Sequence, residues 1–186
     1  AASSQAILAS TAAPEVFINA ASDSLCVGAT WNGQVLINPG NTVLTDFGWT
    51  LDGLEVGPTS PAPLNQVIET TGLHTVEVSA SNSCGTAVKQ YAVFAAPIPE
   101  ITFNAPYASC NGFPVEITAS GGNSYFWSAT EQALDDGFDS DSSVTYIMNG
   151  YLLGSVVGTQ AYGSFSCSST ENFSVNASPV PSLEIV

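Results

Sequence analysis

Hydrophobic and polar residues alternate with a period of two in several segments of the chain. Residues 75–81 read Thr-Val-Glu-Val-Ser-Ala-Ser, and residues 173–177 alternate in the same way. Such alternation places one set of side chains on the buried face of a strand and the other set in solvent. We therefore predict strands in both segments, with Val76, Val78 and Ala80 facing inward in the first.

Clusters of Gly, Pro, Asn and Ser interrupt these runs, for example at residues 38–41, 82–85 and 121–123. They recur roughly every eight to twelve residues, which is typical of β-sandwiches. No stretch shows the apolar stripe of an amphipathic helix. The pattern predicts an all-β protein.

Landmark residues occur twice in the same order. Cys26 is followed by Cys110 after 84 residues (110 − 26), and Cys84 by Cys167 after 83 (167 − 84). Trp49 is similarly matched by Trp127 further along the chain. A repeated set at a nearly constant offset indicates a duplicated structural unit.

The duplication predicts two tandem β-sandwiches, one in residues 1–97, with its first strand from about residue 14, and one in 98–179. Residues 180–186 repeat the proline-rich start of the second unit and predict a further linker or a strand that docks onto a neighbour. The proline-rich junction at residues 95–99 predicts limited bending between the units.

Charge excludes one class of partner. The 186 residues carry sixteen Asp and Glu but one Lys or Arg, so the formal net charge is −15. Binding of nucleic acid or of an anionic membrane surface requires many basic side chains, so we expect neither. No run is long and apolar enough for a membrane helix, and we expect no membrane insertion.

Each unit has one set of residues that resembles a known family. The first set is Phe-Gly-Trp-Thr-Leu-Asp-Gly at 47–53 with Asn-Ser-Cys-Gly at 82–85. The second is Cys-Asn-Gly at 110–112 with Ser-Tyr-Phe-Trp-Ser at 124–128. These sets resemble the polycystic kidney disease (PKD) domain and related immunoglobulin-like repeats of large secreted bacterial surface proteins, including gliding adhesins. The first unit lacks the family's second acidic residue before Gly53. The resemblance implies that each unit is an immunoglobulin-like, PKD-like Greek-key β-sandwich used as a spacer, stalk or adhesive module.

Four cysteines, two per unit, indicate disulfides and an oxidising compartment, because no CxxC pair accompanies the single His. We expect Cys26, Cys84, Cys110 and Cys167 to take part. Pairing within each unit, 26 with 84 and 110 with 167, is one model. The other joins Cys26 to Cys167 and leaves Cys84 and Cys110 to bond with neighbours.

Strand directions in an immunoglobulin-like Greek key weigh against the model that pairs cysteines within each unit. The earlier cysteine of each unit precedes the second strand and the later one follows the sixth, which places them near opposite ends of the sandwich. Cysteines with Cα atoms more than about 7 Å apart cannot bond. Both models remain open at this stage.

One loop, at residues 134–142, concentrates acidic residues: Asp135, Asp136, Asp139 and Asp141. Ca²⁺ prefers several oxygen ligands at short range, and a bent acidic loop supplies them. The downstream Glu of an EF-hand is absent. The loop is thus a candidate Ca²⁺ site or a solvated acidic loop, and no other cofactor is expected.

Three residues lie in candidate glycosylation motifs. Asn172 and Asn176 each begin an Asn-x-Ser triplet on the outward face of the last predicted strand, and Ser24 lies in an Asp-Ser-Leu motif. Such short motifs also arise by chance in a chain rich in Ser and Asn.

Aromatic side chains fall into two groups. Trp49 and Trp127 occupy the positions of the central core indole of a sandwich. Trp31 precedes Asn-Gly, a turn signal, so it is expected in a turn, either exposed as a ligand or domain contact or capping the edge of the core. His74 stands alone in a strand and is expected at the surface.

These patterns predict a non-enzymatic, secreted or cell-surface structural or adhesive module, part of an adhesin array or a filament. Its partners would be neighbouring copies or repeats joined end to end, and glycans are a further candidate. The alternative is a carbohydrate-binding accessory of a secreted polysaccharide-degrading enzyme, which would use Trp31 with Tyr107 or Tyr151. No nucleophile-and-base motif is present, so no catalytic residue is assigned.

Overall fold

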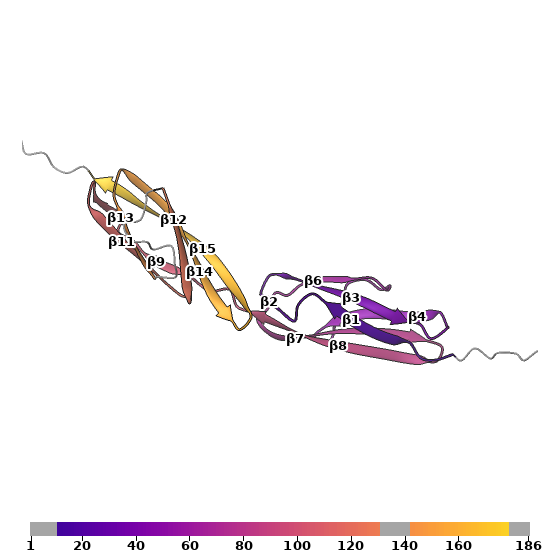
Figure 1. Ribbon diagram of the computed structural model, residues 1–186. Helices are drawn as coiled ribbons and strands as arrows, with labels where there is room; N and C mark the ends of the chain where they lie inside the picture. The colour runs from indigo at the N-terminus through magenta and orange to yellow at the C-terminus, as the bar shows by residue number, and fades with distance from the viewer. Residues whose placement is uncertain (1–10, 131–141, 179–186) are drawn as a thin grey trace, which may run out of the picture. The chain divides into compact units, whose positions relative to one another are not determined.

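The computed structural model describes residues 11–130 and 142–178. Regular structure in these residues consists of strands alone, so the all-β prediction is confirmed. The chain forms two compact units, Ala1–Ala96 and Pro97–Val186, each with its own hydrophobic core (Figure 1).

Unit 1 is a sandwich of a three-stranded and a five-stranded sheet. The first sheet has the order β1-β3-β6 and the second the order β2-β8-β7-β4-β5. The strands are β1 (Glu15–Ala20), β2 (Ser24–Cys26), β3 (Thr30–Asn38), β4 (Leu44–Leu51), β5 (Leu54–Val56), β6 (Leu64–Val67), β7 (Gly72–Asn82) and β8 (Gly85–Ala96).

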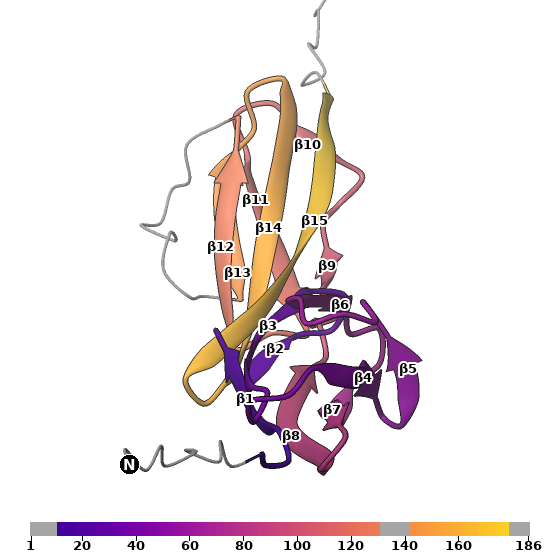
Figure 2. The ribbon, with the colours of Figure 1, turned by 90° about the vertical axis from the view of Figure 1, so that its right-hand side faces the viewer.

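Unit 2 repeats this plan. Its sheets have the orders β13-β11-β9 and β10-β15-β14-β12, and Figure 2 shows β12, β14 and β15 side by side in one layer. The strands are β9 (Thr102–Asn104), β10 (Ala108–Cys110), β11 (Pro114–Ser120), β12 (Ser124–Ala129), β13 (Ser143–Ile147), β14 (Tyr151–Tyr162) and β15 (Phe165–Ser178).

The first segment of each unit changes sheets. After β1, the short β2 crosses to the other sheet and pairs parallel to the last strand, β8; β10 pairs parallel to β15 in the same way. All other strand pairs are antiparallel, and in unit 1 the chain also crosses between the sheets after β3, after β5 and after β6. This arrangement is the immunoglobulin-like Greek key that the resemblance implied.

Alternation along the strands determines the cores. Val76, Val78 and Ala80 of β7 are buried as predicted. Trp49 and Trp127 are each 1% exposed at the centre of their units, which confirms their predicted role in packing.

Candidate functional site

The two cysteines of unit 1 lie at opposite ends of one long strand. Cys26 ends β2 and lies beside Ala96, the last residue of β8. Cys84 lies in the turn between β7 and β8, twelve residues before Ala96 (96 − 84). At about 3.3 Å per residue, that separation is roughly 40 Å.

Unit 2 places its cysteines in the same manner. Cys110 ends β10 and lies beside Ser178, the last residue of β15. Cys167 lies near the start of β15, eleven residues before Ser178 (178 − 167), which corresponds to roughly 36 Å. In both units the separation exceeds the reach of a disulfide several-fold.

The model that pairs the two cysteines within each unit is therefore wrong. Cys26 and Cys167 are disulfide-bonded, whereas Cys84 and Cys110 carry free, exposed thiols. Each pair within a unit would require one of the free cysteines, so neither pair forms. The physical reason is the length of β8 and β15, which holds the two cysteines of each unit at opposite ends.

The backbone around Cys26 and Cys110 is the same in both units. The amide following each cysteine donates to the carbonyl of the last strand residue, from Val27 to Ala96 and from Asn111 to Ser178. The next residue is a glycine with positive φ in both units, at +82° and +83°. Glycine is required there because residues with a Cβ rarely adopt this conformation.

Asn82 holds the turn that presents Cys84. Its side chain is 7% exposed, and its Oδ1 accepts hydrogen bonds from the backbone N–H groups of Cys84 (2.8 Å) and Gly85 (3.1 Å). Its Nδ2 donates to the carbonyls of Ala12 (2.7 Å) and Pro39 (2.8 Å). The turn is thus tied to the segment that enters unit 1, a role that the sequence did not reveal.

Trp31 is a second correction, because it is neither in a turn nor exposed. It lies in β3, is 2% exposed, and packs edge-on against Trp49 with ring centroids 6.4 Å apart. Its Nε1 donates to the carbonyl of Ser22 at 3.1 Å. Asn32-Gly33 continues the strand and forms no turn. Gly33 leaves room for the indole, because an ideal Cβ on Gly33 would lie 2.2 Å from the Trp31 ring.

His74 is also buried, contrary to its expected place at the surface, and it pairs with Asp52. Its Nδ1 lies 2.7 Å from Asp52 Oδ2, and its Nε2 lies 2.8 Å from the carbonyl oxygen of Thr70. Because both partners are acceptors, the site favours the doubly protonated imidazolium. The hydrogen bond with Asp52 raises the pKa of His74, and the same bond lowers the pKa of Asp52.

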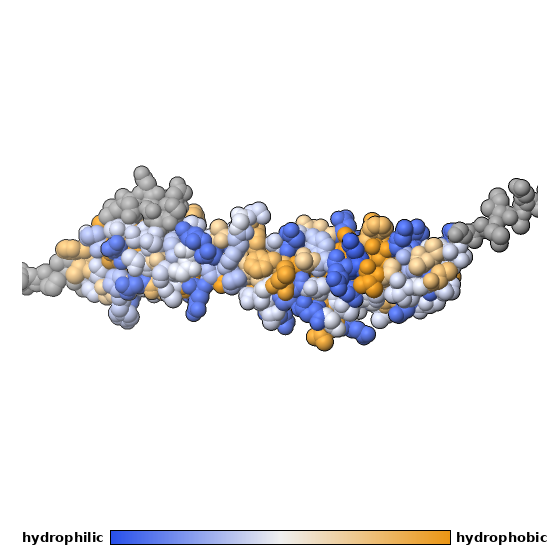
Figure 3. All heavy atoms as spheres, turned by 90° about the horizontal axis from the view of Figure 1, so that it is seen from below, coloured by the Kyte–Doolittle hydropathy of each residue, from blue (hydrophilic) through white to orange (hydrophobic). Residues whose placement is uncertain are grey.

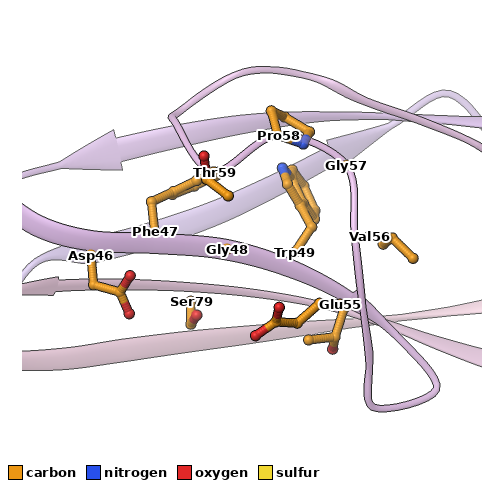
Figure 4. A pocket seen from close by; sticks show the side chains of 11 residues that line it. Asp46, Phe47, Gly48, Trp49, Glu55, Val56, Gly57, Pro58, Thr59 and Ser79 are labelled. Atoms are coloured by element: carbon orange, nitrogen blue, oxygen red, sulfur yellow. The ribbon is translucent and has the colours of Figure 1, made fainter.

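Residues in the middle of β4 line a hollow of about 430 Å³ (Figure 4). Asp46, Glu55 and Ser79 lie on one side of the strand, and Phe47 and Trp49 lie on the other. The Trp49 indole is 1% exposed and donates to the carbonyl of Ala62 at 3.1 Å. It therefore offers no face on which a sugar could stack.

The candidate modification residues differ in exposure. Asn172 is exposed and Asn176 is half-buried, while Phe173 and Val175 between them are in the core. Ser24 is half-buried, and its hydroxyl donates to Asp23 at 2.8 Å. The acidic loop with Asp135, Asp136, Asp139 and Asp141 lies outside the described residues. Within residues 11–130 and 142–178, no three His, Cys, Asp or Glu side chains gather as a metal site would require.

Across the part of the chain that the structure describes, no helix has the length and apolarity needed to cross a membrane. Fold and topology define a pair of immunoglobulin-like β-sandwich modules, a class whose members are generally non-enzymatic.

Comparison with known proteins adds structural likeness only. No family model and no curated protein matches the sequence. Among solved structures, an I-band fragment of titin matches 91% of this chain and 67% of its own, at 14% identity and a TM-score of 0.46. Fibronectin(III)-like modules of Clostridium thermocellum CbhA match 88% and 95%, at 13% identity and a TM-score of 0.41. Likeness at this level identifies no shared function.

Proposed function

We propose that this chain is a non-enzymatic structural or adhesive module of an extracellular array or filament, of the PKD-like type, and that a disulfide between Cys26 and Cys167 joins its two sandwiches. The observation that supports the proposal most is that Cys26 and Cys167 are bonded while Cys84 and Cys110 are free. The two cysteines of each unit are too far apart to bond with each other.

The position of each bonded cysteine in its own unit supports the crosslink. Cys26 lies beside Ala96, the last residue of unit 1. In unit 2, the β14–β15 hairpin that carries Cys167 hydrogen-bonds to the first residues, from Tyr162 Oη to the carbonyl of Pro97 (2.9 Å) and from Ser169 Oγ to that of Pro99 (2.6 Å). Ala96 and Pro97 are joined by a peptide bond, so each cysteine lies at the linker end of its unit.

A crosslink of this kind suits a load-bearing function. It restricts bending at a junction that prolines already stiffen, because a disulfide beside a linker removes most of the linker's conformational freedom. Disulfides persist in oxidising compartments, which supports secretion or display at the cell surface. The single Lys and the absence of Arg leave trypsin-like proteases almost no cleavage site.

Peptide mapping under non-reducing conditions tests the crosslink directly. We expect one crosslinked peptide pair containing Cys26 and Cys167, and Cys84 and Cys110 in alkylated form. Cys26→Ser should free Cys167 for alkylation, whereas Cys84→Ser should leave the crosslink intact. Recovery of a Cys26–Cys84 peptide would overturn the proposal.

Two further measurements test the function. Small-angle scattering should show a broader distribution of sizes for Cys26→Ser than for the unmodified chain, because only the prolines then limit bending at the junction. Electron microscopy of native material should show filaments or surface fibres with a repeat of two domains. Native material that consists only of dispersed secreted enzyme carrying this chain would instead indicate an accessory module.

The carbohydrate-binding alternative now depends on unit 2 alone, since Trp31 is buried. Tyr107 and Tyr151 are 86% and 51% exposed. They flank Asn176, whose backbone N–H donates to the Tyr107 carbonyl at 3.2 Å and which lies opposite Tyr151 in the ladder. Glycan-array binding that Tyr107→Ala and Tyr151→Ala abolish, while Tyr162→Ala does not, would favour this function.

A further inference from the structure

One free cysteine lies where the chain enters unit 1, and the other lies where the chain leaves unit 2. Cys84 is held by Asn82, which also binds Ala12, so it lies where the chain enters unit 1. Cys110 lies beside Ser178, where the chain leaves unit 2. Both thiols are exposed, and nothing in the described residues covers them.

Their bonded counterparts occupy matching positions. Cys26 ends β2 at the exit of unit 1, as Cys110 ends β10 at the exit of unit 2, and the backbone hydrogen bonds around them are the same. Cys167 lies in the hairpin at the entry of unit 2, as Cys84 does at the entry of unit 1. The second strand of the hairpin is two residues longer in unit 2 than in unit 1 (14 residues in β15 and 12 in β8), so Cys167 lies inside its strand and Cys84 in the turn.

Exposed apolar side chains accompany both thiols. Near Cys110, Tyr107 and Phe113 are 86% and 55% exposed. Near Cys84, Val43 is 84% exposed, one residue before Leu44, which pairs with Asn82. Figure 3 shows further apolar side chains among polar ones on the face that it presents, so exposed apolar groups are not confined to the surroundings of the two thiols. A second copy that bonded to either thiol would cover these neighbouring apolar side chains.

We propose that Cys110 of one copy of this chain forms a disulfide with Cys84 of a second copy, head to tail. The inference rests on the proposed function, because it extends the exit-to-entry crosslink from Cys26 and Cys167 to the junction between copies. A single exit-to-entry contact that repeats without closing generates a filament. Each copy would then be covalently joined to the copies before and after it.

The reaction balances with a disulfide oxidant. The Cys84 and Cys110 thiols lose two protons and two electrons as their S–S bond forms, and the oxidant's own disulfide is reduced to two thiols. The exchange proceeds when a thiolate of one copy attacks the oxidant, and the resulting mixed disulfide is attacked by the thiolate of the other copy. Oxidised glutathione supplies the oxidant in the test below.

Variants of the full chain that each lack one of the two free cysteines distinguish this pairing from random oxidation. Oxidised glutathione should convert the unmodified chain into a ladder of multimers on non-reducing electrophoresis, and a reductant should collapse the ladder to monomer. Cys84→Ser alone and Cys110→Ser alone should remain monomeric. An equimolar mixture of the two variants should form a dimer and no larger species, with one peptide pair containing Cys84 and Cys110.

Two outcomes would overturn the inference: either variant dimerising by itself as readily as the mixture does, or the unmodified chain remaining monomeric at high concentration. A surface variant sharpens the test. Tyr107→Ser should slow dimer formation in the mixture several-fold, whereas Phe126→Ser, an exposed aromatic on β12, should not.

Failure of this inference is separable from failure of the proposed function. The Cys26–Cys167 peptide is measured in the same digests. Its presence without a Cys84–Cys110 peptide would retain the stiffened two-domain module and reject the covalent filament. Its absence would reject both.

Discussion

The two units solve the same packing problem with different residues at the same positions. In β3 of unit 1, the inward pair is Trp31 and Gly33; in β11 of unit 2, at an offset of 84, it is Val115 and Ile117. The Trp31 ring covers Gly33, where a Cβ would lie 2.2 Å from it. In unit 1 a single side chain, Trp31, therefore fills the core volume that two side chains share in unit 2. Neither Trp31 nor Gly33 can be replaced alone without a loss of stability.

The largest effect is expected from breaking this pair. Trp31→Val should destabilise unit 1 by about 3 kcal/mol, because it leaves a cavity and removes the hydrogen bond to Ser22. Gly33→Ile alone should cost about 1–3 kcal/mol through overpacking. The double variant, which copies unit 2, should cost less than the sum of the two. Urea unfolding followed by tryptophan fluorescence measures the coupling, and strict additivity would show that the indole does not fill the place of the missing side chain.

Unit 2 has its own glycine-dependent contact. A Cβ on Gly154 would lie 2.2 Å from the Phe173 ring and 2.8 Å from the carbonyl of Ser128. Gly154→Ala should therefore destabilise unit 2 by about 2 kcal/mol. The matched control is Gly48→Ala in β4, where the nearest atom, Ser79 Oγ, is 3.9 Å away and we expect a change within about 0.5 kcal/mol. Equal effects in thermal unfolding would contradict the steric argument.

A smaller difference concerns one hydroxyl. Tyr125 of unit 2 is 7% exposed, and its hydroxyl accepts from Gly122 N (2.9 Å) and donates to Gly122 O (3.1 Å). Two residues before its core Trp, unit 1 has Phe47, which lacks the hydroxyl. Tyr125→Phe should destabilise unit 2 by about 1 kcal/mol, because the two hydrogen bonds are lost. Phe47→Tyr should destabilise unit 1, because the new hydroxyl would be buried without a hydrogen-bond partner. A neutral Tyr125→Phe would show that water replaces the bond.

The smallest effect is a pH dependence confined to unit 1. The raised pKa of His74 stabilises the fold fully below the unfolded value of about 6.5, and this contribution is lost as the pH rises through the folded value. The lowered pKa of Asp52 stabilises above about 3.9 and is lost as the pH falls through its folded value. The pair is therefore at full strength between about pH 4 and 6.5.

The magnitude should stay below about 1 kcal/mol, because the Asp52 side chain is 48% exposed and water screens the charge. Asp52→Asn tolerates the positive φ of +51° at this position and should flatten the dependence. Unit-resolved hydrogen exchange between pH 5 and 8 measures it. A dependence of equal size in unit 2 would assign it to the overall negative charge.

Much of the fold could be predicted from local patterns. The period of two placed Val76, Val78 and Ala80 inward, and the repeated Trp located both core centres. The predicted strand directions already set Cys26 and Cys84 far apart, because distance along a strand depends on residue count alone. Trp31 was misplaced because Asn-Gly is a frequent turn signal, and only packing reveals that Gly33 makes room for an indole.

The sequence by itself therefore determined the strand class and the duplication, both of which follow from spacing along the chain. Only the tertiary structure decided which residues from distant segments meet: His74 with Asp52, Asn82 with Ala12, and Trp31 with Trp49. It also decided which thiols are bonded and which are free. Such contacts depend on how sheets face one another, and no periodicity within a single strand encodes that arrangement.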